Sequence, residues 1–221
     1  MTRKECAVNK MQEESTRTLY DNQSKIYDIT FGKLVLNRLD RAISEHMHLR
    51  PNDRVLDLGV GTGNSLQYYP DGVRVIGVDL SAGMLSKCCR KIKESGVATH
   101  HICQADALHL PFADNSFDHV FVSHVISVVS DPVRLMSEAQ RVARLAGRVV
   151  VVNHFQSTNR ILALLEKVLC PLCTKLGWRS DLALADLIRR TGVEVDYRYK
   201  HDLIDFWETV VMTNNKSLLA V

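Results

Sequence analysis

The chain has 221 residues, of which 46% are apolar and 24% are charged, and its formal net charge is +3 at pH 7. This length and composition are typical of one globular domain, and they exclude a disordered or a fibrous protein. The small positive charge gives no reason to expect nucleic acid as a partner, but it suits a protein that contacts an anionic membrane surface.

The sequence carries no sign of export or of a membrane span. No apolar run reaches the length of about 18 residues that a transmembrane helix needs. The first residues are polar, so no secretory signal is expected. The six cysteines are scattered, and Cys170 and Cys173 lack the second pair of ligands that a zinc site requires. We therefore expect a cytoplasmic protein with reduced thiols and no metal ion.

Residues 1–14 are expected to form a flexible tail, and residues 15–50 an N-terminal helical segment. Apolar residues such as Ile26 and Leu34 recur there at the spacing of an amphipathic helix, and Arg38 lies off that face. Two interpretations remain open. The helix packs on the following domain, or it is a lid that closes over a ligand and lies partly in a membrane interface.

Strands and helices alternate through residues 51–221. Strands are expected at residues 54–58, 73–78, 99–103, 117–123 and 148–153, with a closing hairpin at 193–200 and 206–213. Helices are expected at residues 81–95, 132–145 and 181–191, with a helical insertion over 157–190. This alternation predicts an α/β fold, with a Rossmann-like, seven-stranded, mostly parallel sheet covered on both faces and an N-terminal helical lid.

The strongest local motif is VLDLGVGTG, which runs from Val55 to Gly63 after the first expected strand. A glycine-rich turn at this point lets the backbone approach a ligand closely, with a helix N-terminus beyond it. The spacing is GxGxG, whereas the dinucleotide pattern GxGxxG would need a glycine at Asn64. Asp79 ends the second strand, where an acid accepts hydrogen bonds from ribose hydroxyls.

Two further motifs follow in order, QADA after the third strand and FADNSFD before the fourth. Together with VLDLGVGTG and VIGVDLSAGML, they resemble the class I S-adenosylmethionine methyltransferases over residues 55–153. The resemblance implies that the glycines pass beneath the methionine part of the cofactor, that Asp57 lies beside it and that Asp79 binds the ribose. The cofactor-binding residues that it implies are Asp57, Gly59, Gly61, Gly63, Asp79, Leu80, Met84, Asp106 and Ala107.

Polar residues emerge from two neighbouring strands near the expected cofactor. Ser123, expected to bind the cofactor, and His124 end the fourth strand at the cofactor edge. Asn153, expected to bind the substrate, and His154 repeat the arrangement after the fifth strand. A single buried histidine is more often a packed core residue than a catalyst. Because there are two at adjacent strand ends, the catalytic and the packing interpretations both stay open.

A closer resemblance covers most of residues 20–181. The segments YD..FG, GVGTGNSLQYY, VISVVSDP, VVVNHF and LGWRSD resemble the bacterial phosphatidylethanolamine N-methyltransferases and the related ornithine-lipid N-methyltransferases. The resemblance implies that the methyl acceptor is the amine head group of a membrane lipid. The alternatives are a soluble small molecule and a quinone-type carbon acceptor. The glycine-rich segment that the quinone enzymes carry after the fourth strand has no match here.

The insertion supports a lipid independently, because its apolar residues form a dense surface bordered by lysine and arginine. These apolar residues are Ile161, Leu162, Leu164, Leu165, Val168, Leu169 and Leu172. Arg179 is expected to bind the phosphate or carboxylate of a lipid head group, because its fork can bind two oxygens at once. We expect a peripheral protein on the inner face of the cell membrane. A buried helix with a solvated rim is the alternative.

Methyl transfer from a sulfonium is an in-line displacement, so the protein mainly aligns the amine with the methyl carbon. The amine must be neutral, although a free primary ammonium titrates roughly three to four units above pH 7. A histidine with a pKa near neutrality can take its proton. His124 and His154 are the candidates, with Tyr20 and Tyr27 positioning the head group, and water is the alternative base.

Overall fold

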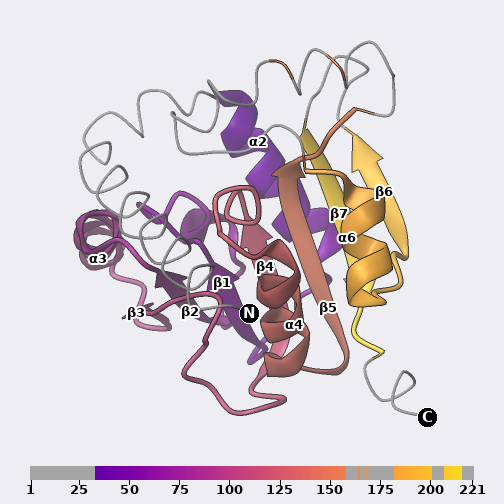
Figure 1. Ribbon diagram of the computed structural model, residues 1–221. Coiled ribbons are helices and arrows are strands. Elements are labelled where there is room, and N and C mark those ends of the chain that lie inside the picture. Colours follow the sequence, from indigo (N-terminus) through magenta and orange to yellow (C-terminus); the bar gives the residue numbers. More distant parts are fainter. Residues whose placement is uncertain (1–32, 158–163, 165–167, 169–181, 201–206, 216–221) are drawn as a thin grey trace.

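The computed structural model describes residues 33–157, 164, 168, 182–200 and 207–215 of the chain. Within these ranges seven strands form one sheet in the order β3-β2-β1-β4-β5-β7-β6 (Figure 1). The strands are β1 (Arg54–Leu58), β2 (Arg74–Asp79), β3 (His100–Gln104), β4 (Phe117–Ser123), β5 (Ala143–His154), β6 (Tyr197–Lys200) and β7 (Trp207–Thr213). The first five strands are parallel, and β7 is antiparallel to both of its neighbours. The predicted fold is therefore confirmed.

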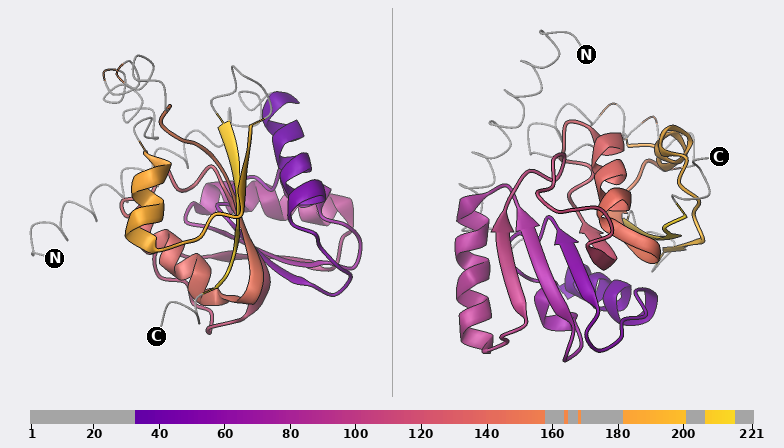
Figure 2. Two further views of the ribbon diagram at one scale, coloured as in Figure 1. Left: turned by 90° about the vertical axis from the view of Figure 1, so that its right-hand side faces the viewer. Right: turned by 90° about the horizontal axis from the view of Figure 1, so that it is seen from below.

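Helices cover both faces of this sheet. They are α2 (Lys33–Arg41), which continues into the π-helix η1 (Ala42–His46), the 3-10 helix η2 (Leu66–Tyr68), α3 (Ala82–Ser95), α4 (Pro132–Val142) and α6 (Leu184–Thr191). Figure 2 shows α2 and α3 on one face and α4 and α6 on the other. The sheet is therefore buried on both sides, as parallel sheets usually are.

The core follows the two-residue period of the strands. In β5, Val149 and Val151 pack in the cluster under α4 and α6, whereas Val150 and Val152 pack in the cluster under α2 and α3. The run of four valines is buried throughout because each face of the central strand meets its own layer of helices.

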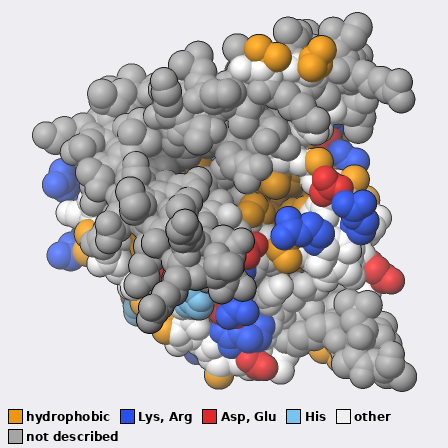
Figure 3. All heavy atoms as spheres, viewed as in Figure 1, with side chains coloured by type: hydrophobic (Ala, Val, Ile, Leu, Met, Phe, Trp, Pro, Cys, Tyr) orange, Lys and Arg blue, Asp and Glu red, His pale blue; other side chains and the backbone are white. Residues whose placement is uncertain are grey.

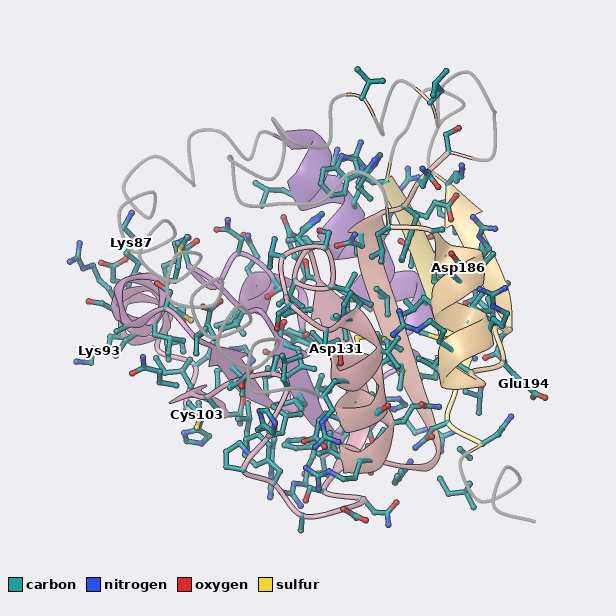
Figure 4. The ribbon with its side chains drawn as sticks, viewed as in Figure 1. Lys87, Lys93, Cys103, Asp131, Asp186 and Glu194 are labelled. Atoms are coloured by element: carbon teal, nitrogen blue, oxygen red, sulfur yellow. The ribbon has the colours of Figure 1, made fainter. Side chains whose placement is uncertain are left out.

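Local capping residues set the bounds of α3 as the sequence predicts. The Ser81 hydroxyl accepts a hydrogen bond from the Met84 N–H at 3.1 Å, and Gly96 ends the helix in the left-handed conformation with φ +69°. Asp131, labelled in Figure 4, caps α4 by accepting from the N–H groups of Val133 and Arg134, both at 3.0 Å. Side-chain oxygens at these positions satisfy N–H groups that have no partner inside the helix.

Several elements differ from the prediction in their bounds; β6, for example, begins at Tyr197 instead of residue 193. Helix α4 ends at Val142 instead of residue 145, because β5 begins at Ala143, with a register shift against β4. After the glycine turn the chain forms the short helix η2 and no α-helix. Pro70 follows η2 and has no N–H to donate to the Leu66 carbonyl, so a longer helix cannot continue through it.

Several predictions fall on residues outside the described ranges. They include the tail at 1–14, the N-terminal segment before Lys33, Tyr20, Tyr27, Arg179, the CxxC pair and the insertion except for positions 164 and 168. In the described part of the chain, no helix is long and apolar enough to cross a bilayer. Among the same residues, no three histidine, cysteine or acidic side chains gather as metal ligands do.

Candidate active site

The glycine loop, residues 59–63, leaves β1 and turns back over the end of β2. The N–H groups of Gly59 and Val60 both donate to the Val78 carbonyl, at 2.8 and 3.1 Å. Gly59 has φ +75°, and a Cβ there would lie 2.7 Å from the Val125 Cβ, so only glycine fits. At Gly61 a Cβ would meet nothing closer than 3.9 Å, which leaves this stretch of backbone open to a ligand.

Asp79 lies at the end of β2, directly against this loop. Its Oδ2 accepts a hydrogen bond from the Gly61 N–H at 2.9 Å, and its Oδ1 accepts from the Ser81 N–H at 2.8 Å. Each carboxylate oxygen has two lone pairs, so both can accept a further hydrogen bond from a ribose hydroxyl. The two features that the sequence singles out are therefore in contact.

Asp57 is fully buried beneath the loop, at the end of β1. Its Oδ2 accepts hydrogen bonds from the Ser65 hydroxyl at 2.6 Å and the Tyr69 hydroxyl at 3.0 Å. Burial raises the pKa of Asp57 to about 7, against the opposing effect of these two hydroxyls. Within the described residues its buried Oδ1 has no hydrogen-bond partner. Such an acceptor fits the ammonium group of a bound amino acid.

Ser65 and Tyr69 are functional residues that sequence reasoning missed. Both belong to the quoted segment GVGTGNSLQYY, but nothing in their spacing indicates that their hydroxyls turn back to Asp57. Their arrangement follows from the short helix η2, which brings the flanking residues over the end of β1. The sequence shows only that two residues with hydroxyl groups, Ser65 and Tyr69, flank the short segment that forms η2.

The residues expected near the adenine lie along the ends of β2 and β3. The Ala105 N–H donates to the Asp79 carbonyl at 3.2 Å, and the Gln104 amide donates to the Leu80 carbonyl at 3.0 Å. Asp106 accepts from the Leu108 N–H at 2.8 Å and lies 2.9 Å from the His109 ring nitrogen. Leu80 and Ala107 are half-buried there, whereas Met84 is buried at the start of α3. The predicted adenine-side residues therefore share one edge with Asp79.

On the other side of the glycine loop, β4 and β5 end together. Ser123 pairs with Val152, and the His124 N–H donates to the Val152 carbonyl at 2.8 Å. Asn153 and His154 end β5, where His154 pairs with Trp207 of β7. The fully buried Asn153 amide accepts from the Ser127 hydroxyl at 3.2 Å and donates to the His154 carbonyl at 2.6 Å.

Both histidines contact Trp207, the first residue of β7. The Trp207 and His124 ring centroids lie 4.6 Å apart with the planes at 90°, and the His154 centroid lies 5.9 Å away at 73°. We call His124, His154 and Trp207 the aromatic cluster. The guanidinium carbon of Arg38 lies 5.8 Å from the centroid of the Trp207 ring. Arg38, expected off the apolar face of its helix, therefore reaches the end of the sheet.

The expected near-neutral pKa does not hold for His124. Burial, together with the smaller effect of the nearby positive charge of Arg38, lowers the pKa of His124 to about 3. A charged imidazole is unfavourable where its ring nitrogens are shielded from water and a cation lies close by. His124 is therefore neutral at pH 7 and is a weak proton acceptor.

Comparison with known proteins agrees with this geometry. A family model described as a methyltransferase domain matches residues 56–151. The phosphatidylethanolamine N-methyltransferase of Cereibacter sphaeroides is 41% identical over 171 residues, which cover 77% of this chain and 83% of that protein. A demethylmenaquinone methyltransferase of Beutenbergia cavernae is 39% identical over 139 residues, which cover 61% of this chain and 56% of that protein.

The crystal structure of a methyltransferase-like protein from Bacillus halodurans has the same fold, with a TM-score of 0.64 and 22% identity over 74% of this chain and 71% of that one. The chain belongs to the class I S-adenosylmethionine-dependent methyltransferases, and S-adenosylmethionine is its cofactor. Within that class it resembles the phosphatidylethanolamine N-methyltransferases. The glycine loop, Asp57 and Asp79 are the residues of this chain that suit the cofactor.

Proposed function

We propose that this methyltransferase acts on the amine head group of a membrane lipid, phosphatidylethanolamine or an ornithine lipid. The observation that carries the proposal is the 41% identity to a phosphatidylethanolamine N-methyltransferase over 83% of that protein's length. The 171 matched residues extend beyond the cofactor motifs, which lie within residues 55–153. The acceptor is set by residues outside those motifs, so similarity there bears on the substrate.

Exposed apolar side chains in the insertion support a lipid acceptor. Leu164 and Val168, two apolar residues of the insertion, are both in helical conformation. Their exposed fractions are 64% and 69%, large for leucine and valine. Hydrophobic side chains lie at the top of Figure 3, the end of the molecule to which β5 points in Figure 1. Burying each in a bilayer contributes roughly 1.5–3 kcal/mol.

Charge supports an anionic membrane surface in the same half of the chain. Residues 144–200 contain ten lysines and arginines against five acidic residues. Basic residues beside an apolar surface favour anionic lipid. We place the protein at the inner face of the cell membrane, with Arg179 on the head-group anion.

The cofactor supplies a methyl carbon bound to a positive sulfur. The lipid amine forms the new N–C bond with its lone pair, so the protein must bind that amine neutral and in line with the methyl carbon. Tyr20 and Tyr27 position the head group in this proposal. His154 or water receives the proton in this proposal, and the neutral ring of His124 orients the Trp207 ring through their edge-to-face contact.

A quinone-type carbon acceptor is the second candidate, because a demethylmenaquinone methyltransferase is 39% identical over 139 residues. Labelled methyl transfer separates the two. Purified full-length protein is supplied with labelled S-adenosylmethionine and vesicles that contain phosphatidylethanolamine, ornithine lipid or a demethylated quinol. We expect label in the aminolipid after thin-layer separation. Label in the quinol alone, or only in soluble amines, would overturn the proposal.

Vesicle binding tests the membrane surface separately. The double variant Leu164→Asp, Val168→Asp should lose at least about tenfold in binding to vesicles with anionic lipid, since it removes two apolar contacts. Leu145→Asp is the matched control, because Leu145 is also exposed (51%) but lies near the opposite end of β5. Equal losses in both variants would mean that the insertion has no special part in binding.

A further inference from the structure

Trp207 begins β7 at the point where β4 and β5 end. It pairs in register with His154, and its ring is half-buried. The rings of His124 and His154 meet it at 90° and 73°, so two imidazoles from two different strands fix the plane of the indole. A ring held in this way presents a defined aromatic surface at the end of the sheet where β4 and β5 end.

A cation already lies on this ring. The Arg38 guanidinium carbon is 5.8 Å from the ring centroid, within the about 6 Å over which a cation is attracted to an aromatic face. Arg38 comes from α2, on the same face of the sheet as the aromatic cluster. The imidazole of His124 is neutral, so this ring adds no charge that would repel a cation.

An alkylated ammonium suits such a surface better than a primary one. A primary ammonium holds its water strongly through three N–H groups, whereas a quaternary ammonium has none and gives up water easily. Aromatic faces are therefore a recurrent means of binding quaternary ammonium groups. A head group that gains methyl groups should bind the indole more tightly at each step.

We infer that the indole of Trp207 binds the methylated ammonium of the lipid head group, and that Arg38 occupies this position until the lipid displaces it. The inference rests on the proposed lipid amine acceptor and specifies how that acceptor is recognised. Trp207 then determines specificity, because its ring favours intermediates that already carry methyl groups. Arg38 competes with the lipid for the same aromatic face.

Binding of short-chain lipids to the full-length protein with S-adenosylhomocysteine tests this. The series runs from dihexanoyl phosphatidylethanolamine through its mono- and dimethyl forms to dihexanoyl phosphatidylcholine, measured by calorimetry. Wild-type affinity should rise about tenfold along the series. Trp207→Leu should abolish the rise, Trp207→Phe should keep part of it, and Arg38→Gln should raise the affinity for phosphatidylcholine a fewfold.

The control is Tyr197→Leu, which removes an exposed aromatic from the adjacent strand β6 and should leave the series unchanged. A merely structural Trp207 predicts a different pattern. Trp207→Leu would then weaken the binding of all four lipids equally, and Arg38→Gln would weaken the binding of phosphatidylcholine. Either result overturns the inference. If the Trp207→Leu variant does not fold, the affinities of the Trp207→Phe and Arg38→Gln variants still distinguish the two roles of Trp207.

The two proposals fail in different ways. If wild-type protein methylates no aminolipid in the labelled assay, the lipid function fails. If it methylates phosphatidylethanolamine but binds the four head groups equally, the lipid function stands and the role of Trp207 is wrong.

Discussion

On the cofactor side of the site, the polar groups come from one short stretch of chain. Asp57 and Asp79 belong to two consecutive strands, the glycine loop follows the first of them, and the Gly61 N–H donates to the Asp79 carboxylate at 2.9 Å. On the side where we propose that the acceptor binds, Arg38, His124 and Trp207 come from α2, the end of β4 and the start of β7. The first side consists of carboxylates and backbone N–H groups, and the second of rings and one guanidinium.

This difference matches what we propose that each side binds. A nucleoside has many hydroxyl and amino groups at fixed positions, so directed hydrogen bonds recognise it well. An amine that becomes methylated loses its N–H groups step by step, so a surface that needs no hydrogen bond can hold every form of it. Changes on the cofactor side should therefore have large effects on binding, and changes on the acceptor side smaller and graded ones.

The largest effect is expected at Asp79. Asp79→Ala removes the ribose acceptor and the carboxylate that holds Gly61, each charge-assisted bond being worth about 1.5–3 kcal/mol. The affinity for S-adenosylhomocysteine, measured by calorimetry, should fall by about 10²–10³-fold. Asp71→Ala, at an exposed position near the start of β2, should leave it unchanged. An Asp79 variant with normal affinity would mean that the cofactor lies elsewhere.

The next largest effect concerns the shape of the loop. Gly59 and Gly96 both have positive φ, but a Cβ at Gly59 would lie 2.7 Å from Val125, whereas a Cβ at Gly96 meets nothing within 4 Å. Gly96→Ala should cost about 1 kcal/mol from backbone strain alone. Gly59→Ala should cost about 3 kcal/mol or more, because overpacking adds to the strain. Urea unfolding measures both, and equal costs would show that the contact with Val125 relaxes freely.

A pH series tests the buried carboxylate. The pKa of Asp57 is raised to about 7, so below pH 7 the cofactor's ammonium binds only after Asp57 loses its proton. The affinity for S-adenosylhomocysteine should be constant above pH 7 and fall up to about tenfold per unit below it. Asp57→Asn should bind weakly with no such slope. A flat wild-type profile between pH 5.5 and 8 would show that Asp57 does not face the ammonium.

The same raised pKa affects stability without ligand. Between the ordinary value of 3.8 and about 7, the folded protein keeps a proton on Asp57 that the unfolded chain has released. The unfolding free energy should therefore decrease as the pH rises through this range, and the decrease should be absent in Asp57→Asn.

The smallest effect is expected at His124. Because its pKa is lowered to about 3, this ring carries no proton away at neutral pH. His124→Asn should reduce turnover by less than about tenfold, whereas loss of a general base costs about 10²–10⁴-fold. Parallel kcat measurements on His154→Asn show whether the second ring has that role. A loss of a hundredfold or more at His124 would contradict the neutral, orienting role.

The sequence alone predicts those parts of the structure that depend on residues close together in the chain. The bounds of α3 could be predicted because Ser81 and Gly96 cap it locally, and the cofactor side because its motifs are contiguous. The place of Trp207 at the end of β5, and the approach of Arg38 to it, could not be predicted, because they depend on which strand pairs with β5. The turn of Ser65 and Tyr69 toward Asp57, and the early end of α4, likewise follow from packing between distant segments.

The place of β7 in the sheet has a consequence for synthesis. β7 follows β6 in the chain but lies between β5 and β6, so β5 has an unpaired edge until residues 207–213 have left the ribosome. That edge includes four consecutive valines, and unpaired apolar strands readily join other chains. During translation the sheet therefore stays incomplete and prone to aggregation at β5 until β7 emerges. Chaperones that bind extended apolar segments would protect the chain in this period.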